Sequence, residues 1–179
     1  VKLSNAISTS GGISVNYGTL ELNSAFTGGD MTVASGATLK GTGSVAGTTG
    51  VTSATVNGTG LTLTGGAASG NGGAILSSAT LTLEDCVLRG NSATGSGGAL
   101  SAFGNVILRR CTLTQNTATA SGGALSFTGG NLVHLENSAF TANEAGERGG
   151  AISISFSSIG GNINNRLYQC KIGRASCRE

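Results

Sequence analysis

The stretch Leu81-Thr-Leu-Glu-Asp-Cys-Val-Leu-Arg-Gly-Asn91, followed by Gly97-Gly98-Ala99-Leu100, occurs twice more along the chain. The second copy is Leu108-Arg-Arg-Cys-Thr-Leu-Thr-Gln-Asn116 with Gly122-Gly123-Ala124-Leu125, and the third is Leu135-Glu-Asn-Ser-Ala-Phe-Thr-Ala-Asn143 with Gly149-Gly150-Ala151-Ile152. Successive copies lie about 25 residues apart, and the asparagine precedes the Gly-Gly-Ala by the same distance in each. Such a repeat indicates one supersecondary unit that is stacked on its neighbours.

The phasing within the unit indicates which kind of unit it is. Apolar side chains alternate with their neighbours over 81–83, 86–88 and 152–156, which is the period of a β-strand. The alternation slips at Glu84-Asp85, where we expect one corner, and a second corner is expected at Arg89-Gly90-Asn91. Three short strands per rung, stacked about 4.8 Å apart, would bury their inward side chains in continuous columns. The sequence therefore predicts an all-β, single-stranded parallel β-helix, which we expect to be right-handed.

The composition agrees with this fold and excludes several classes of function. The chain has 32 glycines and no proline, and 10% of its residues are charged. Proline would remove donors from strands that pair on both sides, whereas glycine permits tight corners. A net charge of +2 is too small to predict nucleic-acid binding. No apolar run is long enough to cross a bilayer as a helix.

The predicted organisation is one β-helix domain over residues 1–171. Residues 1–60 are expected to form short irregular rungs, and residues 61–171 regular rungs of about 25 residues. The chain starts within the pattern, so we interpret it as a fragment without natural caps, whose exposed ends would self-associate. Residues 172–179 break the pattern and resemble the translation of a sequencing adapter, so we interpret them as a non-native tail.

The Gly-Gly-Ala-aliphatic phrases, together with Leu-x-x-Asn or Phe-x-x-Asn, resemble the repeats of the polymorphic outer-membrane protein family. The second phrase runs from Leu88 to Asn91, Leu113 to Asn116 and Phe140 to Asn143. The resemblance implies a pectin-lyase-like β-helix that is the passenger of an autotransporter, either secreted or displayed on the bacterial surface. It also implies membrane attachment only through a C-terminal translocation barrel outside these residues.

The function that the resemblance implies is that of a structural stalk or an adhesin, with a host surface protein or a glycan as partner. Similar phrases occur in other bacterial β-helix proteins, some of which degrade polysaccharides. The alternative is therefore a polysaccharide-active enzyme of β-helix fold, either a pectate-lyase-like lyase or a glycosidase.

Two sets of polar side chains recur at corners and are predicted to form structural ladders. Asparagine tolerates left-handed backbone and can bond the neighbouring rung, so its column is expected to be buried, with a glycan contact as the alternative. The asparagine set is Asn91, Asn116 and Asn143. In the charged set acid and base alternate, which would fix the register of the rungs. The charged set is Glu84, Arg109 and Glu136, with Asp85, Arg110 and Asn137 beside it.

Cys86, Cys111 and Cys170 are predicted to share an inward column, with Ser138 between the last two. Adjacent rungs would place the Cα atoms of Cys86 and Cys111 about 4.8 Å apart, inside the window for a disulfide. Parallel side chains would nevertheless keep their Cβ atoms too far apart without a local shift. We expect buried free thiols that act as small hydrophobes, with a disulfide as the alternative in an exported protein.

The sequence predicts no catalytic residue, no cofactor site and no metal site, so we expect the chain not to be an enzyme. A glycosidase needs paired carboxylates on one face, and a lyase of this fold needs acidic calcium ligands and a base. Glu84-Asp85 is the only adjacent acidic pair, and Arg109-Arg110 follows one rung later. His134 lies between two inward positions, so it is expected to face solvent.

Overall fold

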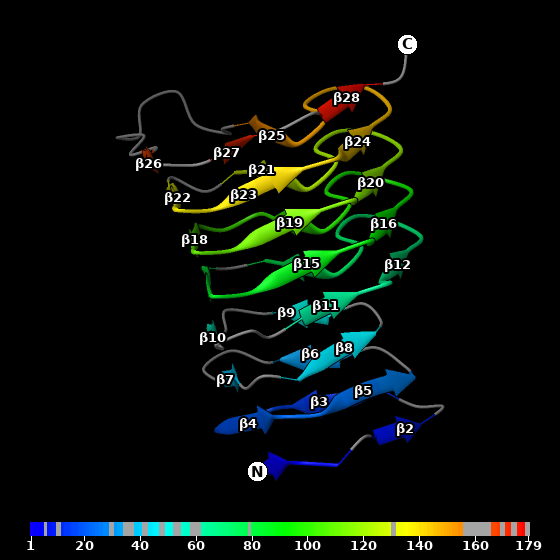
Figure 1. Ribbon diagram of the computed structural model, residues 1–179, viewed down its shortest axis with the longest axis vertical. Coiled ribbons are helices and arrows are strands. Elements are labelled where there is room, and N and C mark those ends of the chain that lie inside the picture. Colours follow the sequence, from blue (N-terminus) through cyan, green and yellow to red (C-terminus); the bar gives the residue numbers. More distant parts are fainter. Residues whose placement is uncertain are drawn as a thin grey trace.

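The chain forms an elongated column of stacked turns, with its two ends at opposite ends of the column (Figure 1). The computed structural model describes residues 1–5, 7–9, 12–28, 31–33, 38–40, 43–46, 49–51, 55–57, 62–78, 80–129, 132–155, 166–168, 171–172 and 175–177. Strands are the only regular elements of these residues, and every strand pair is parallel. The predicted all-β solenoid of stacked parallel strands is confirmed.

Sheet A contains eight strands and forms one side of the column. Its strands are β1 (Lys2–Leu3), β4 (Thr19–Leu22), β7 (Thr38–Lys40), β10 (Thr55–Asn57), β14 (Leu81–Glu84), β18 (Val106–Arg109), β22 (Val133–Glu136) and β26 (Arg166–Tyr168). The register places Leu83 beside Leu108 and Leu108 beside Leu135. All three leucine side chains are buried, so this sheet contributes a column of leucine to the core.

Sheet B also contains eight strands and follows sheet A in each turn of the chain. Its strands are β2 (Ile7–Thr9), β5 (Ala25–Gly28), β8 (Ser44–Ala46), β11 (Thr62–Thr64), β15 (Val87–Arg89), β19 (Thr112–Thr114), β23 (Ala139–Thr141) and β27 (Lys171–Ile172). Leu113 lies between Leu88 and Phe140, and all three side chains have no exposed surface. Leu113 therefore lies in one of the continuous buried columns that the sequence predicted for inward side chains.

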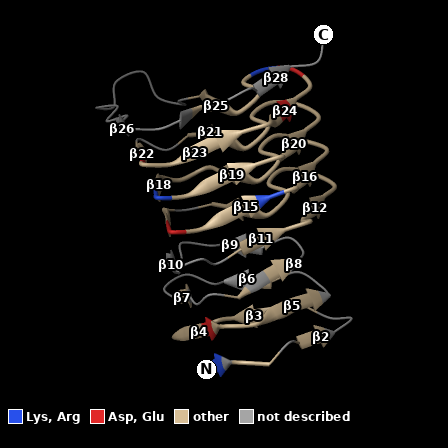
Figure 2. Ribbon diagram, in the orientation of Figure 1, with Lys and Arg blue, Asp and Glu red and all other residues tan. Residues whose placement is uncertain are grey.

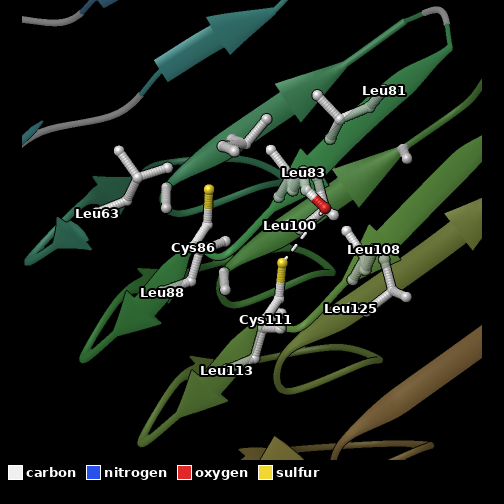
Figure 3. Packing of buried hydrophobic residues seen from close by; sticks show 14 of the residues in the cluster. Leu63, Leu81, Leu83, Cys86, Leu88, Leu100, Leu108, Cys111, Leu113 and Leu125 are labelled. Carbon is white, nitrogen blue, oxygen red and sulfur yellow. Dashed lines mark hydrogen bonds between the residues drawn. The ribbon is translucent and has the colours of Figure 1, made fainter. Parts of the chain in front are cut away.

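Sheet C closes each turn with seven strands, several of which follow a Gly-Gly-Ala. Its strands are β3 (Ile13–Val15), β6 (Met31–Val33), β9 (Thr49–Val51), β13 (Ile75–Ser77), β17 (Leu100–Ala102), β21 (Leu125–Thr128) and β25 (Ile152–Ser155). Figure 3 shows Leu100 and Leu125 of this sheet pointing towards the leucines of sheets A and B. The three sheets thus enclose one continuous apolar core.

Sheet D is a narrow fourth sheet that the sequence did not predict. Its strands are β12 (Ala67–Ala68), β16 (Ser92–Ala93), β20 (Thr117–Ala118), β24 (Asn143–Ala145) and β28 (Ala175–Cys177). The three strands predicted for each rung are present, and sheet D adds a fourth between sheets B and C from Ala67 onward. In the turns of Asn91 and Asn116 it directly follows the asparagine, and in the turn of Asn143 it begins at that residue.

The corners contain left-handed backbone at residues that are not all glycine. In the first corner the positive φ angles belong to Asp85 (52°), Arg110 (52°) and Asn137 (48°), and in the second to Gly90 (63°), Gln115 (56°) and Ala142 (52°). At the second corner the residue before each asparagine adopts the left-handed backbone, so the asparagine does not use its own tolerance of that conformation. The asparagine side chains are buried.

The second glycine of each Gly-Gly-Ala is required by the neighbouring rung. A Cβ atom on Gly98 would overlap the backbone carbonyl oxygen of Gly123, and one on Gly73 would overlap that of Gly98. Because glycine has no Cβ, the two backbones lie close together here, and Gly98 N donates to Gly122 O at 3.1 Å. The glycine repeat is therefore a packing requirement between rungs.

The solenoid continues into the C-terminal segment that breaks the sequence pattern. Ile172 pairs with Phe140, and Ala175 pairs with Asn143, where the repeat would have another asparagine. Half of the Ile172 surface remains exposed. The interpretation of residues 172–179 as a non-native tail stays a prediction.

Candidate functional site

The corner between sheets A and B holds the strongest concentration of charge in the described part of the chain. Arg109 Nη1 lies 2.9 Å from Glu84 Oε1, and Arg109 Nε lies 3.4 Å from Glu136 Oε2. The three residues occupy equivalent positions in successive strands β14, β18 and β22. Figure 2 shows acidic and basic colour on adjacent turns at this corner. One guanidinium thus bridges two carboxylates across three rungs.

The adjacent position of the same corner holds a second ion pair. Arg110 Nε and Nη2 donate to the two carboxylate oxygens of Asp85 at 2.6 and 2.8 Å. This fork of hydrogen bonds from Arg110, reinforced by its charge, lowers the pKa of Asp85. The Asp85 carboxylate in turn raises the pKa of Arg110. Arg110 Nη2 also lies 3.9 Å from Glu84 Oε2, so both acids of the Glu84-Asp85 pair face arginines.

His134 lies on the outer face of sheet A, beside the charged corner. Its side chain is half-buried, and Nε2 lies 3.3 Å from Glu136 Oε2. In register it stands between Ile107 and Arg166. The outward direction predicted for this histidine matches the structure, while its carboxylate neighbour was not predicted.

Asn91, Asn116 and Asn143 form a continuous ladder inside the second corner. Asn91 Nδ2 donates to Asn116 Oδ1 at 3.0 Å, and Asn116 Nδ2 donates to Asn143 Oδ1 at 2.9 Å. The backbone N–H groups of Asn91 and Asn116 donate to the same two oxygens, both at 3.0 Å. All three residues are almost completely buried.

The hydrogen-bonding capacity of the Asn116 side chain is filled entirely by protein. Its Oδ1 accepts two hydrogen bonds from Asn91, and its Nδ2 donates to Asn143 Oδ1 and to Leu88 O, the latter at 3.0 Å. A primary amide has two donors and two acceptor lone pairs, so none remains for a ligand. The protein itself therefore occupies every hydrogen-bonding position of the Asn116 side chain, and the structural role of the ladder stays a prediction.

Cys86 and Cys111 lie in adjacent turns inside the first corner, and both are buried free thiols (Figure 3). Cys86 Sγ lies 3.0 Å from Glu84 O, and Cys111 Sγ lies 3.4 Å from Leu83 O. The next residue of the column is Ser138, whose hydroxyl oxygen accepts from Cys111 N at 3.1 Å. Cys170 lies outside the described residues.

The two thiols change each other's acidity. The side-chain contact with Cys111, and then burial, raise the pKa of Cys86. The same contact lowers the pKa of Cys111, because its thiolate would accept a hydrogen bond from the Cys86 thiol.

A shallow open groove lies over sheet D, and sequence reasoning did not find it. Its volume is about 370 Å³, and its walls carry alanine, serine and threonine. The lining residues are Ala67, Ala68, Ser69, Ser92, Ala93, Thr94, Thr117 and Thr119. The only sequence signal is the recurrence of small residues after each corner. The lining offers hydroxyl groups, and no ionisable side chain belongs to it.

The described ranges hold neither a metal cluster nor a membrane-spanning helix. No group of three or more His, Cys, Asp or Glu side chains there is arranged to hold a metal ion. Nor does that part of the chain contain a helix with the length and apolarity needed to cross a membrane.

Two segments of the chain match the family model of the Chlamydia polymorphic membrane protein repeat, namely residues 85–102 and 110–128. Each segment runs from the first corner through one strand each of sheets B, D and C. Each contains one asparagine of the ladder and one Gly-Gly-Ala. The match confirms the resemblance to polymorphic membrane protein repeats inferred from the sequence. Among curated proteins and among solved structures, none matches the chain.

Proposed function

We propose that this chain is a segment of a bacterial passenger that is displayed on the cell surface or secreted, where the solenoid acts as a stalk or an adhesin. The observation that carries the proposal is the match of residues 85–102 and 110–128 to polymorphic membrane protein repeats. The family is one of outer-membrane proteins, which supports a location at the outer membrane or cell surface.

The distribution of repeated and variable residues supports a binding or spacing role. The repeated residues point inward or sit at close backbone contacts, as Asn116 and Gly98 do. Outward positions differ from rung to rung, so that Thr62, Val87 and Thr112 succeed one another on sheet B. An adhesin would use such outward side chains to contact a host surface protein or a glycan, while the buried ladders keep the scaffold constant.

The state of the acidic pair supports this function over the polysaccharide-active alternative. Glu84 and Asp85 are each held by an arginine at 2.9 Å or less. A general acid works best when its pKa is raised towards neutrality, whereas the pKa of Asp85 is lowered. The ion pairs thus favour a role in aligning rungs.

Surface display can be tested on intact cells that produce the protein. Antibodies raised against the folded chain should label unpermeabilised cells, and external protease should remove the label. A periplasmic marker, which should be labelled only after permeabilisation, controls for cell integrity. Labelling that requires permeabilisation would contradict surface display.

A bead-binding assay distinguishes an adhesin from a stalk. Beads coated with the folded chain should bind host cells, while beads coated with the heat-denatured chain should not. Treatment of the host cells with glycosidases or with protease then distinguishes a glycan partner from a protein partner. Equal binding by both kinds of bead would remove the adhesin role and leave the stalk.

A further inference from the structure

We propose that Cys86 and Cys111 are a modification site, at which a disulfide bond joins two adjacent rungs when the chain folds in the presence of a thiol oxidant. Both residues are free thiols in the structure. The oxidant is a small-molecule disulfide, such as oxidised glutathione. Only the expectation that the chain meets an oxidising compartment rests on the proposed function.

The register brings the two cysteines together. Val87 pairs with Thr112, so the residues that precede them, Cys86 and Cys111, are also neighbours. The hydrogen bond from Thr112 N to Cys86 O, 2.9 Å long, holds this relationship. Neighbouring parallel strands lie about 4.8 Å apart, which is within the Cα separation that a disulfide allows.

The corner gives the cysteines more freedom than a strand would. Both lie between strands, Cys86 after β14 and Cys111 after β18. Each follows a residue with left-handed backbone, Asp85 or Arg110, both with φ of 52°. A disulfide needs its Cβ atoms about 3.5–4.5 Å apart, somewhat closer than the strand spacing. The proposed bond therefore requires a small movement of one corner, next to the β15–β19 ladder that begins at Val87 and Thr112.

The column offers Cys111 one thiol neighbour among the described residues. On its other side is Ser138, whose hydroxyl accepts from Cys111 N at 3.1 Å and donates to Glu136 O at 2.9 Å. Cys86 and Cys111 have 1% or less of their surface exposed, so an oxidant reaches them before the rungs close. The bond therefore forms during folding.

The reaction proceeds by two exchanges. The thiolate of one cysteine attacks a sulfur of the oxidant's disulfide, forming a mixed disulfide and releasing one oxidant thiol. The thiolate of the other cysteine attacks the protein sulfur of that mixed disulfide and releases the second oxidant thiol. The protein loses two electrons and two protons, and the oxidant is reduced to two thiols.

The test is refolding of the full chain from urea in buffers of reduced and oxidised glutathione. After refolding, the protein is unfolded in acid, alkylated and digested with trypsin, which can cut at Arg89, Arg109 and Arg110 and so separates the two cysteines. In the oxidised buffer we expect a linked pair of peptides containing Cys86 and Cys111. Its mass should be lower than the sum of the reduced peptides by two hydrogen atoms, and reductant should restore both thiols.

A control variant and a stability measurement complete the test. Cys111→Ser should fold, because serine already occupies the next position of the column at Ser138, and it should leave Cys86 alkylatable. The oxidised wild type should need more urea to unfold than the reduced form, since the bond closes a loop of about 25 residues in the unfolded chain. This difference should vanish in Cys111→Ser.

Several results would overturn the proposal. One is a refolded chain, with the circular dichroism of β-structure, in which both thiols remain alkylatable after oxidising refolding. Others are Cys86 or Cys111 linked only to glutathione, to Cys170 or to a second chain. None of these bears on surface display, because the chemistry is measured on the isolated chain.

Discussion

Asn116 Nδ2 donates to Asn143 Oδ1 over 2.9 Å, and Asn116 N donates to the same oxygen over 3.0 Å. One acceptor in the later rung thus satisfies both a side-chain and a backbone donor of the rung before it. The same arrangement links Asn91 to Asn116. Buried polar groups that are left unsatisfied cost about 1–3 kcal/mol each, so this ladder should be sensitive to small changes.

Asn116→Asp should destabilise the protein strongly and in a pH-dependent way. The new oxygen would face two acceptors, Leu88 O and Asn143 Oδ1, so the free energy of unfolding should fall by about 2–5 kcal/mol at neutral pH. Burial raises the folded-state pKa of such an aspartate above its unfolded value of about 3.9, so the loss should shrink as pH falls through the folded-state pKa and should be smallest below the unfolded value. Urea titrations at neutral pH and at about pH 3 measure this.

The exposed Thr119→Asp is the control for Asn116→Asp, and it should change stability little at either pH. An equal loss from Asn116→Asp at both pH values would contradict the donor role assigned to Nδ2.

Leu113→Ala should lower the free energy of unfolding by about 2–5 kcal/mol. The side chain is fully buried between Leu88 and Phe140, and stacked rungs on both sides limit collapse into the cavity. Its outward neighbour Thr112 is half-buried, and Thr112→Ala should cost far less. Urea denaturation of both variants tests the assignment of inward and outward faces, which fails if the two losses are alike.

Ala142→Gly should stabilise the protein by about 0.5–1 kcal/mol, because φ of Ala142 is 52° and glycine has no Cβ to oppose that angle. Gly90 holds the equivalent corner position two rungs earlier, with φ of 63°, and a Cβ at that position would meet no atom within 4 Å. Gly90→Ala should therefore lose a similar amount through the backbone alone. Urea denaturation of both variants measures the two changes. Shifts of the same sign would show that backbone angle does not decide stability at this corner.

Arg110→Ala should raise the pKa of Asp85 towards its ordinary value, because the two hydrogen bonds that lower it would be lost. In the wild type the pKa of Asp85 is lower in the folded state than in the unfolded state. The ion pair therefore stabilises the fold fully at pH values above the unfolded-state pKa of Asp85. That contribution is lost as pH falls through the folded pKa. Carbon NMR titration of the Asp85 carboxyl measures the change, and Arg148→Ala, on an exposed loop, should leave it untouched.

The purified chain should release no products from pectin or alginate, with or without calcium. Glu84 and Asp85 form ion pairs with arginines, so we expect neither carboxylate to act as a catalytic acid or base. Reducing-end and unsaturated-product assays would detect hydrolysis and elimination respectively. Reproducible turnover that disappears in Glu84→Gln or Asp85→Asn would establish the enzymatic alternative.

The columns could be predicted from sequence because a repeat multiplies a weak local signal. A single Leu-x-Leu does not distinguish a strand from other structures. When it recurs with Cys, Asn and Gly-Gly-Ala at fixed offsets, the repeat determines the register of both Leu113 and Asn116. The charged corner followed from the same register. In the structure Arg109 pairs with two glutamates and Arg110 pairs with Asp85. This choice of partners depends on the directions of the side chains, which cannot be deduced from the spacing of residues in the sequence.

Sheet D and the left-handed corners were missed for physical reasons. A strand of two residues such as Ser92–Ala93 has no alternation to detect, and the groove over it consists of common small residues. Gln115 and Ala142 adopt positive φ although neither residue type favours it. The stacking of rungs imposes that backbone conformation on them. Residue propensities reflect only the intrinsic energetic cost of a positive φ angle, so they do not predict it here.

The asparagine ladder gives the column a polarity. Every amide N–H that crosses between Asn91, Asn116 and Asn143 points towards the C-terminal rung, and every receiving oxygen belongs to the later residue. The amide dipoles therefore align and polarise one another along the axis. A column that ends at Asn91 or Asn116 therefore leaves amide donors open until the following rung supplies their acceptor, whereas a column that begins at Asn116 or Asn143 leaves an acceptor open until the preceding rung supplies its donors.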